Sequence, residues 1–278
     1  MSVWEKLQNL DPRWFYYILL IVISIPIVKP WGLPIKIGSQ SEAFHEAIEA
    51  LNPNDVIFVV AGYRTDSIVE MDPQLAVLFR RALEKDVKVV VWGAVDEGAM
   101  VAQRVIEPIA EEMGAVYGVH WINLGYKPIS DALLQKMIDD FPQAMAYTEM
   151  GGGRLDSYEI TRDIRTVTQF DLIVCLTNVT PSPAQSILKM ITIPKSVPLA
   201  VGTTAMCLPE EMPYYSSGHY IGLLGGLRGA AEYELLTGIA GSAIAAMDAQ
   251  SAAHFLVIIL IILGNLGYFF SKKEAKSR

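Results

Sequence analysis

Charged residues are scarce in this chain, making up 19% of its 278 residues, while apolar residues make up 52%. Ordinary soluble domains carry roughly 25% charged residues, so this composition indicates segments that do not face water. The net charge is −8, and residues 29–251 alone hold 16 Lys and Arg against 27 Asp and Glu. Nucleic-acid-binding surfaces are usually basic, so we expect no nucleic-acid partner and no broad adhesion to anionic lipid.

Cysteine is almost absent, with two residues in the whole chain and no C-x-x-C motif. This excludes the usual zinc and thioredoxin-like signatures. Cys175 lies inside an apolar, strand-like run and Cys207 follows another. A disulfide remains open, but two small buried thiols are favoured. The four histidines are scattered along the chain, and we predict no metal site.

The familiar catalytic and phosphate-binding motifs are missing as well. No strand-like run is followed by G-x-G-x-x-G, which excludes the dinucleotide fingerprint. GAVDEG (93–98) has no Gly-Lys-Ser/Thr after its second glycine, so it is not a P-loop, and the chain contains no G-x-S-x-G. The cofactor is therefore unknown, and enzymatic activity is undecided.

Two long apolar runs are present. WFYYILLIVISIPIV (14–28) carries no charge and continues through Lys29 to Leu33, and residues 252–270 carry no formal charge. A membrane span needs about 20 such residues, and aromatic residues flank both runs. We predict transmembrane helices at 14–33 and 252–270, with tails at 1–13 and 271–278. The alternatives are a cleaved signal peptide for the first run and a buried core helix for the second.

Basic residues near the two runs predict the orientation in the cell membrane. The two tails hold six Lys and Arg, whereas only Lys29 and Lys36 lie near the other ends of the spans. By the positive-inside rule, both termini are expected in the cytoplasm and the intervening domain on the outer side. The domain would be cytoplasmic if the first run had its N-terminus outside.

Between the runs, β-branched apolar segments alternate with amphipathic ones. Strands are expected at 55–62, 87–93, 117–125, 171–178 and 197–204. Helices are expected at 74–86 (with Asp72 as N-cap), 97–114, 130–141, 158–170 and 184–191. This alternation predicts an α/β domain over residues 34–220, with a doubly wound, mostly parallel sheet of about five strands flanked by helices.

Ligands of open parallel sheets bind beyond the carboxyl ends of the strands. Polar residues follow the expected strands at those ends, and they are the first set of ligand-binding candidates: Arg64, Asp66, Asp96, Glu97, Asn178, Thr203 and Thr204. Arg64 would hold a small anionic ligand, and Asp66 or Asp96 would serve as acid or base. Any α/β domain has polar loops here, so ordinary loops and helix caps are the alternative.

A second candidate is the run of three glycines in TEMGGGRLD (148–156). Successive glycines can turn several backbone N–H groups toward one anion. Gly151, Gly152, Gly153 and Arg154 would then hold a phosphate or carboxylate. A flexible connection followed by surface arginines is the favoured alternative.

Residues 221–251 are rich in small residues, and we predict a helical connector, with a break near Gly238 left open, that continues into the second span. Small residues every four positions allow close helix packing, which gives as candidates Gly222, Gly226, Gly229, Gly238, Gly241, Ala245 and Ala249. The partner would be the first transmembrane helix, the domain itself or a second copy of the chain, which would make a homo-oligomer. Asp248 is expected to be paired or hydrated.

These features predict a membrane-anchored α/β protein that acts by ligand binding or as a subunit of a membrane assembly, in contact with the lipid bilayer. The alternative is a membrane-bound enzyme that acts on a small anionic substrate at the carboxyl ends of the strands.

Overall fold

The computed structural model describes residues 11–277, except for the side chains of residues 271 and 273–277. The chain divides into two compact units, which are described separately. One unit contains residues 1–34 and 244–278, and the other contains residues 35–243. The α/β unit therefore extends beyond the expected boundary at residue 220.

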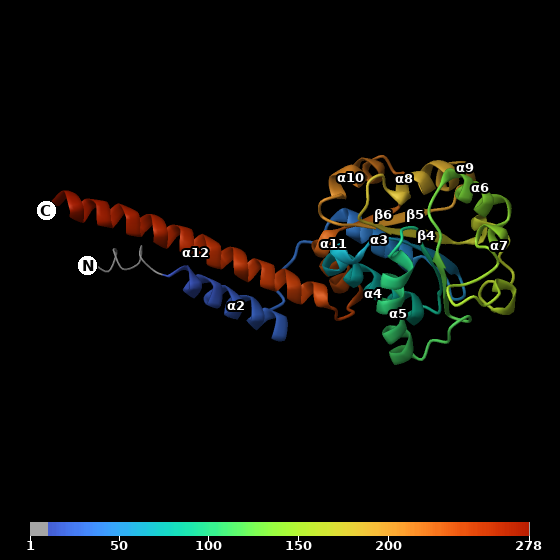
Figure 1. Ribbon diagram of the computed structural model, residues 1–278, viewed down its shortest axis with the longest axis horizontal. Helices are drawn as coiled ribbons and strands as arrows, with labels where there is room; N and C mark the ends of the chain where they lie inside the picture. The colour runs from blue at the N-terminus through green and yellow to red at the C-terminus, as the bar shows by residue number, and fades with distance from the viewer. Residues whose placement is uncertain (1–10, 278) are drawn as a thin grey trace. The chain divides into compact units, whose positions relative to one another are not determined.

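Residues 35–243 form a six-stranded, fully parallel sheet with helices on both faces (Figure 1). The strands are β1 (Val56–Gly62), β2 (Lys88–Gly93), β3 (Trp121–Tyr126), β4 (Leu172–Thr177), β5 (Leu199–Thr203) and β6 (Gly222–Gly225). Their order is β3-β2-β1-β4-β5-β6, so the direction of winding reverses between β1 and β4. The predicted α/β class and flanking helices are confirmed, with one strand more than expected.

Each strand alternates its side chains between two cores. Phe58 and Val60 of β1 pack with residues of α6 (Asp131–Asp139), α7 (Phe141–Ala144), α8 (Pro183–Ile187) and α10 (Leu208–Ser216), whereas α9 (Ile193–Lys195), on the same face, contributes no buried residue. Ile57 and Val59 pack with the helices of the other face, α3 (Ser39–Glu49), α4 (Ile68–Glu84), α5 (Gly98–Met113) and α11 (Gly226–Thr237). A strand with both faces buried has a continuous apolar sequence, which is why β1, β2, β4 and β5 were predictable. The two cysteines are buried and free.

The glycine-rich stretch is not one helix. Residues 222–225 form the sixth strand, α11 follows at once, and the helix ends at Gly238 in the left-handed conformation, with φ +69°. Gly222 pairs with Ala200 of β5, and this strand position needs glycine because the backbone of Phe44 in α3 lies where a Cβ would be. Leu223 and Leu224 fill the two cores. The expected helical connector is thus the edge strand, a domain helix and a break at 238–241.

Three other local predictions were wrong. The helix expected to start after Asp72 begins at Ile68, so Asp72 lies inside the helix, where its carboxylate accepts a hydrogen bond from the Tyr63 hydroxyl. Residues 117–120 form a turn before β3, in which Gly118 has φ +78°. Residues 158–170 contain turns and the short 3₁₀ helix Val167–Gln169 instead of an α-helix, although Ile160, Ile164 and Val167 are buried as expected.

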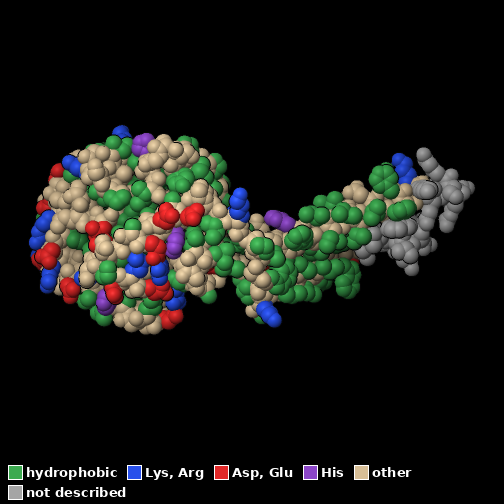
Figure 2. All heavy atoms as spheres, turned by 180° about the vertical axis from the view of Figure 1, so that it is seen from behind, with side chains coloured by type: hydrophobic (Ala, Val, Ile, Leu, Met, Phe, Trp, Pro, Cys, Tyr) green, Lys and Arg blue, Asp and Glu red, His purple; other side chains and the backbone are tan. Residues whose placement is uncertain are grey.

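Residues 11–34 and 244–277 contribute two apolar helices, α2 (Pro12–Val28) and α12 (Ser242–Ser277). Within the described residues, α12 is the helix long and apolar enough to cross a membrane, over Ser242–Phe270. Only 6% of its most apolar window is buried, and hydrophobic side chains cover much of this unit's visible surface (Figure 2). The helix at the first expected span has 17 residues, fewer than predicted, so two spans are not established.

Asp248 joins the two ends of this unit. Its carboxylate, 1% exposed, accepts hydrogen bonds from the backbone N–H groups of Trp31 (2.7 Å), Gly32 (2.9 Å) and Leu33 (3.1 Å). These bonds hold the segment that follows α2 against the first turns of α12. Asp248 is therefore paired, and its partners are backbone N–H groups.

Candidate functional site

Except for Thr203, which is the last residue of β5, the predicted carboxyl-end residues lie in the loops after β1, β2, β4 and β5, and the first of these loops contacts two others. Arg64 Nε donates to Asp96 at 2.7 Å, and Glu97 accepts from both the backbone N–H and the hydroxyl of Thr65. Asn178 Nδ2 donates to Asp66 at 2.7 Å across the point where the winding reverses. The hydrogen bond from Arg64 also lowers the pKa of Asp96.

Thr203 and Thr204 are not part of this network. Thr203 is fully buried, and its hydroxyl donates to the Thr177 carbonyl at 3.0 Å. The buried Thr204 hydroxyl has no hydrogen-bond partner among the described residues, and neither does the Asn178 side-chain oxygen. The structure therefore brings Arg64, Asp66, Asp96, Glu97 and Asn178 together at the surface and places Thr203 in the sheet.

At this edge of the sheet, backbone N–H groups already donate hydrogen bonds to the chain's own carboxylates. Glu70 accepts from the Ala205 N–H at 2.7 Å, and Glu97 accepts from the Thr65 N–H at 2.9 Å. Arg64 is already paired, and Asp66 and Glu97 lie close enough to it to raise its pKa further. Loops that already hold negative groups repel a further anion, so this arrangement does not favour a small anionic ligand.

The triple glycine also holds an internal carboxylate. Glu149 accepts hydrogen bonds from the N–H groups of Gly151 and Gly153, both at 2.7 Å, and from the Tyr117 hydroxyl at 2.6 Å. Gly152 is exposed with φ +89°, and Arg154 is paired with Asp156. Backbone N–H groups of the loop thus hold an anion, and that anion is the chain's own Glu149.

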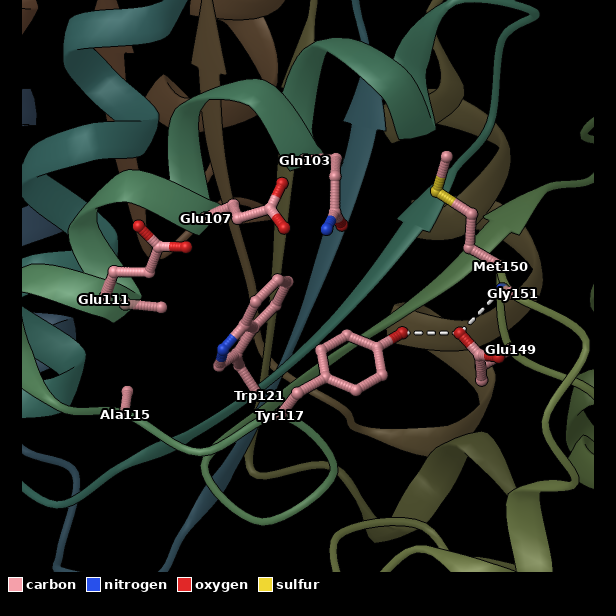
Figure 3. A pocket seen from close by; sticks show the side chains of 10 residues that line it. Gln103, Glu107, Glu111, Ala115, Tyr117, Trp121, Glu149, Met150 and Gly151 are labelled. Atoms are coloured by element: carbon pink, nitrogen blue, oxygen red, sulfur yellow. Dashed lines mark hydrogen bonds between the residues drawn. The ribbon is translucent and has the colours of Figure 1, made fainter.

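Beside this loop lies a cavity of about 560 Å³, within the size range of small-molecule sites (Figure 3). It lies between α5, the segment that leads into β3, and the loop after α7. Its lining residues are Gln103, Glu107, Ala110, Glu111, Ala115, Tyr117, Trp121, Glu149, Met150 and Gly151. This set contains three carboxylates, two aromatic rings and a thioether, and no Lys or Arg.

Burial and hydrogen bonds determine the protonation states of Glu149 and Tyr117, which form the inner wall of the cavity. Burial alone would raise the pKa of Glu149, but the hydrogen bonds from Gly151, Tyr117 and Gly153 outweigh it and lower that pKa. Burial and the bond to Glu149 raise the pKa of Tyr117. Near neutral pH the wall therefore carries an ionised carboxylate and a neutral phenol. Tyr117 meets the Trp121 ring edge-on, with centroids 4.8 Å apart.

Within the described part of the chain, two of the carboxylates and one ring nitrogen have no partner. Glu107 and Glu111 make no side-chain hydrogen bond or ion pair to the described residues, whereas Glu112 on the same helix pairs with Arg80. Trp121 is 3% exposed, and its indole N–H has no hydrogen-bond acceptor in the described part of the chain. Figure 3 shows this nitrogen directed toward Ala115, another residue of the cavity wall.

This cavity was not predicted from the sequence. Gln103, Glu107 and Glu111 recur at i, i+4 and i+8, which places them on one face of a helix, and that spacing was the available signal. Nothing in the sequence indicated that Tyr117, Trp121 and Glu149 lie beside that face, because a turn and a long loop bring them there.

The small-residue candidates lie in different environments. Gly226, with φ +61°, lies beside Ala205 and Glu70, while Gly229 packs on the Leu224 backbone and Gly241 lies beside the Glu234 side chain. Ala249 is buried and Ala245 is half-buried in α12. In the α/β unit, therefore, these glycines allow close contacts within the chain.

Fold and cavity together define an α/β protein that has one helix long and apolar enough to cross a membrane, within the described residues, and a cavity of small-molecule size at the β3 edge of its sheet. Comparisons with protein-family models, curated proteins and solved structures find no match to this chain.

Proposed function

We propose that this protein is a membrane-anchored ligand-binding protein, with a Rossmann-like α/β domain held at the cell membrane by a hairpin of α2 and α12. The observation that carries the proposal is the exposed apolar surface of α12. Phe255, Ile258 and Ile262 are each more than half exposed, and a helix of such residues is stable in lipid rather than in water.

The hydrogen bonds of Asp248 support a second span. They hold the C-terminal side of α2 at the N-terminal side of α12, so the two helices run antiparallel. At 1.5 Å per residue the 17 residues of α2 extend about 25 Å, close to the roughly 30 Å of a hydrocarbon core. Trp14, Tyr16 and Tyr17 at its start are exposed, as expected for rings at the membrane–water interface.

Ligand binding rather than catalysis on an anion is the role that the site supports. The carboxyl-end loops and the triple glycine already bind the protein's own carboxylates, which disfavours the alternative of an enzyme for small anionic substrates. The cavity, by contrast, has unpartnered polar groups and apolar walls. Self-association has less support, because the glycines of the α/β unit serve packing inside the chain.

Cysteine labelling of the full chain in membranes tests the anchor. Ser2→Cys and Ser277→Cys report on the tails, and Ser217→Cys reports on the domain, since both native cysteines are buried. A membrane-impermeant maleimide added outside should label Ser217→Cys at once and both tail variants only after permeabilisation. Labelling of the two tails from opposite sides would contradict the hairpin. Release of the unmodified chain by alkaline washing would contradict membrane anchoring.

The ligand-binding role has a separate test. Thermal unfolding of the full chain in a maltoside detergent is measured against a varied set of small molecules, with Ala115→Trp as the variant that fills the cavity. At least one compound should raise the melting temperature of the wild type and not that of Ala115→Trp. If no compound separates the two proteins, the cavity is not a ligand site.

A further inference from the structure

We propose that the β3-edge cavity binds an organic ammonium compound that also carries a hydroxyl or similar hydrogen-bond acceptor. This inference rests on the proposed ligand-binding function and names its ligand class. Three groups of residues in the cavity wall each favour one chemical feature of such a ligand.

The three carboxylates of the cavity wall favour a positively charged ligand. Glu107, Glu111 and Glu149 line one cavity that has no Lys or Arg in its wall. Glu149 is kept ionised by its three hydrogen bonds, and Glu107 and Glu111 have no cationic partner among the described residues. An organic cation placed between them would be attracted from both sides of the cavity, whereas an anion would be repelled.

The aromatic rings of Trp121 and Tyr117 and the thioether of Met150 favour a ligand with carbon groups around its charged nitrogen. Figure 3 shows Gln103 and Glu107 on one side of the open space and the rings of Trp121 and Tyr117 on the other, with Met150 beside them. Aromatic faces attract ammonium groups, most strongly when the groups carry methyl groups and lose their water. A hydrated metal ion would gain little from these walls, so the apolar lining selects an organic cation.

The indole N–H of Trp121 favours a ligand that carries a hydrogen-bond acceptor. It is buried and unpartnered at the wall near Ala115, and a buried donor without an acceptor is costly. A hydroxyl on the ligand would accept this hydrogen bond. A purely aliphatic amine would leave the indole N–H without a partner.

A matched series of small compounds tests the proposal by titration of the full chain in a maltoside detergent. Choline has both the charge and the hydroxyl, 3,3-dimethyl-1-butanol is its neutral isostere, and ethyltrimethylammonium lacks the hydroxyl. We expect choline to bind best. Loss of the charge should weaken binding by about tenfold or more, and loss of the hydroxyl by about fivefold. Equal binding of choline and the neutral isostere would overturn the proposal.

Phosphocholine distinguishes a free amine from a lipid headgroup. Its phosphate adds negative charge close to three carboxylates, so it should bind more weakly than choline. Tighter binding of phosphocholine would overturn the assignment to a free ammonium compound and point to a headgroup.

Variants on one helix provide the control for surface charge. Glu107→Gln and Glu111→Gln each remove one carboxylate from the cavity, and each should weaken choline binding severalfold. Glu112→Gln makes the same change one position further along, outside the cavity, and should leave binding unchanged. Equal effects of all three would show attraction by surface charge alone and overturn the site. All three side chains are exposed, so folding should persist.

Two outcomes separate this inference from the proposed function. If other compounds stabilise the wild type and not Ala115→Trp while choline does not bind, only the ligand class is wrong. If no compound distinguishes those two proteins, the ligand-binding function itself fails. The labelling test of the membrane anchor is independent of both.

Discussion

Individual carboxylates stabilise much of the backbone in this acidic chain. Glu149, Glu97, Glu70 and Asp248 each accept hydrogen bonds from backbone N–H groups of loops or chain ends. Hydrogen bonds to a charged group contribute more to stability than hydrogen bonds between neutral groups. The excess of Asp and Glu therefore serves internal structure as well as surface charge.

The pH dependence of the free energy of unfolding should reveal how much the ionised Glu149 side chain contributes to stability. Its pKa is lower in the folded protein than the ordinary value of 4.5, so its contribution to stability is full above that value and is lost as the pH falls through the folded pKa. We expect Glu149→Gln to reduce the free energy of unfolding by about 1–3 kcal/mol near pH 7. The difference from wild type should shrink below about pH 4.

Chemical denaturation from pH 3 to pH 7 measures this difference. Glu46→Gln is the control, since that exposed side chain has no partner among the described residues and should change stability little at any pH. A constant difference between wild type and Glu149→Gln across this range would show that ionisation of Glu149 does not contribute.

At the scale of elements, the sequence predicted those strands that are buried on both faces and the helices with clear amphipathic spacing. Strand β4 and helix α5 fall within a residue or two of their expected bounds. Strand β6 was missed because four residues with two glycines give no strand signal. The site was missed for a similar reason: the loop carrying Glu149 reaches β3 through the Met150 N–H to Asn123 carbonyl bond, which no local pattern encodes.

Gly222 should be essential for the edge of the sheet. A methyl group there would meet the Phe44 backbone, which cannot rotate away as a side chain can. We expect Gly222→Ala to destabilise the protein by about 1–3 kcal/mol, the usual cost of overpacking. Thermal unfolding of the full chain in detergent measures this loss, with the half-exposed neighbour change Ile221→Ala as the control. A loss no larger than that of the control would contradict the close contact.

On the scale of the whole molecule, residues 35–243 have their own two cores and their own terminal contacts. Glu232 accepts from the Gly38 N–H at 3.1 Å, and Glu234 accepts from the Ala243 N–H at 2.7 Å. Both ends of the unit are thus tied down by side chains that belong to it. Folding of this unit should not depend on the apolar helices.

Expression of residues 35–243 alone tests that independence. The fragment should remain in solution without detergent, because the exposed apolar residues of α2 and α12 are gone. Its melting temperature should lie within a few degrees of the value for the full chain. Light scattering and circular dichroism would detect the aggregated or unfolded fragment that contradicts this expectation. Residues 35–230, which lack part of α11 and the Glu234 tie, should be clearly less stable.

The Asp248 tie has a consequence for release of the domain from a membrane. With both helices inserted, the domain is attached by two connectors, and the bonds to Trp31, Gly32 and Leu33 keep those connectors together. A protease that cuts one connector leaves the domain attached by the other. In the proposed two-helix anchor, shedding would therefore require two cuts, which would make that anchor more resistant to proteolytic loss than a single membrane-spanning helix.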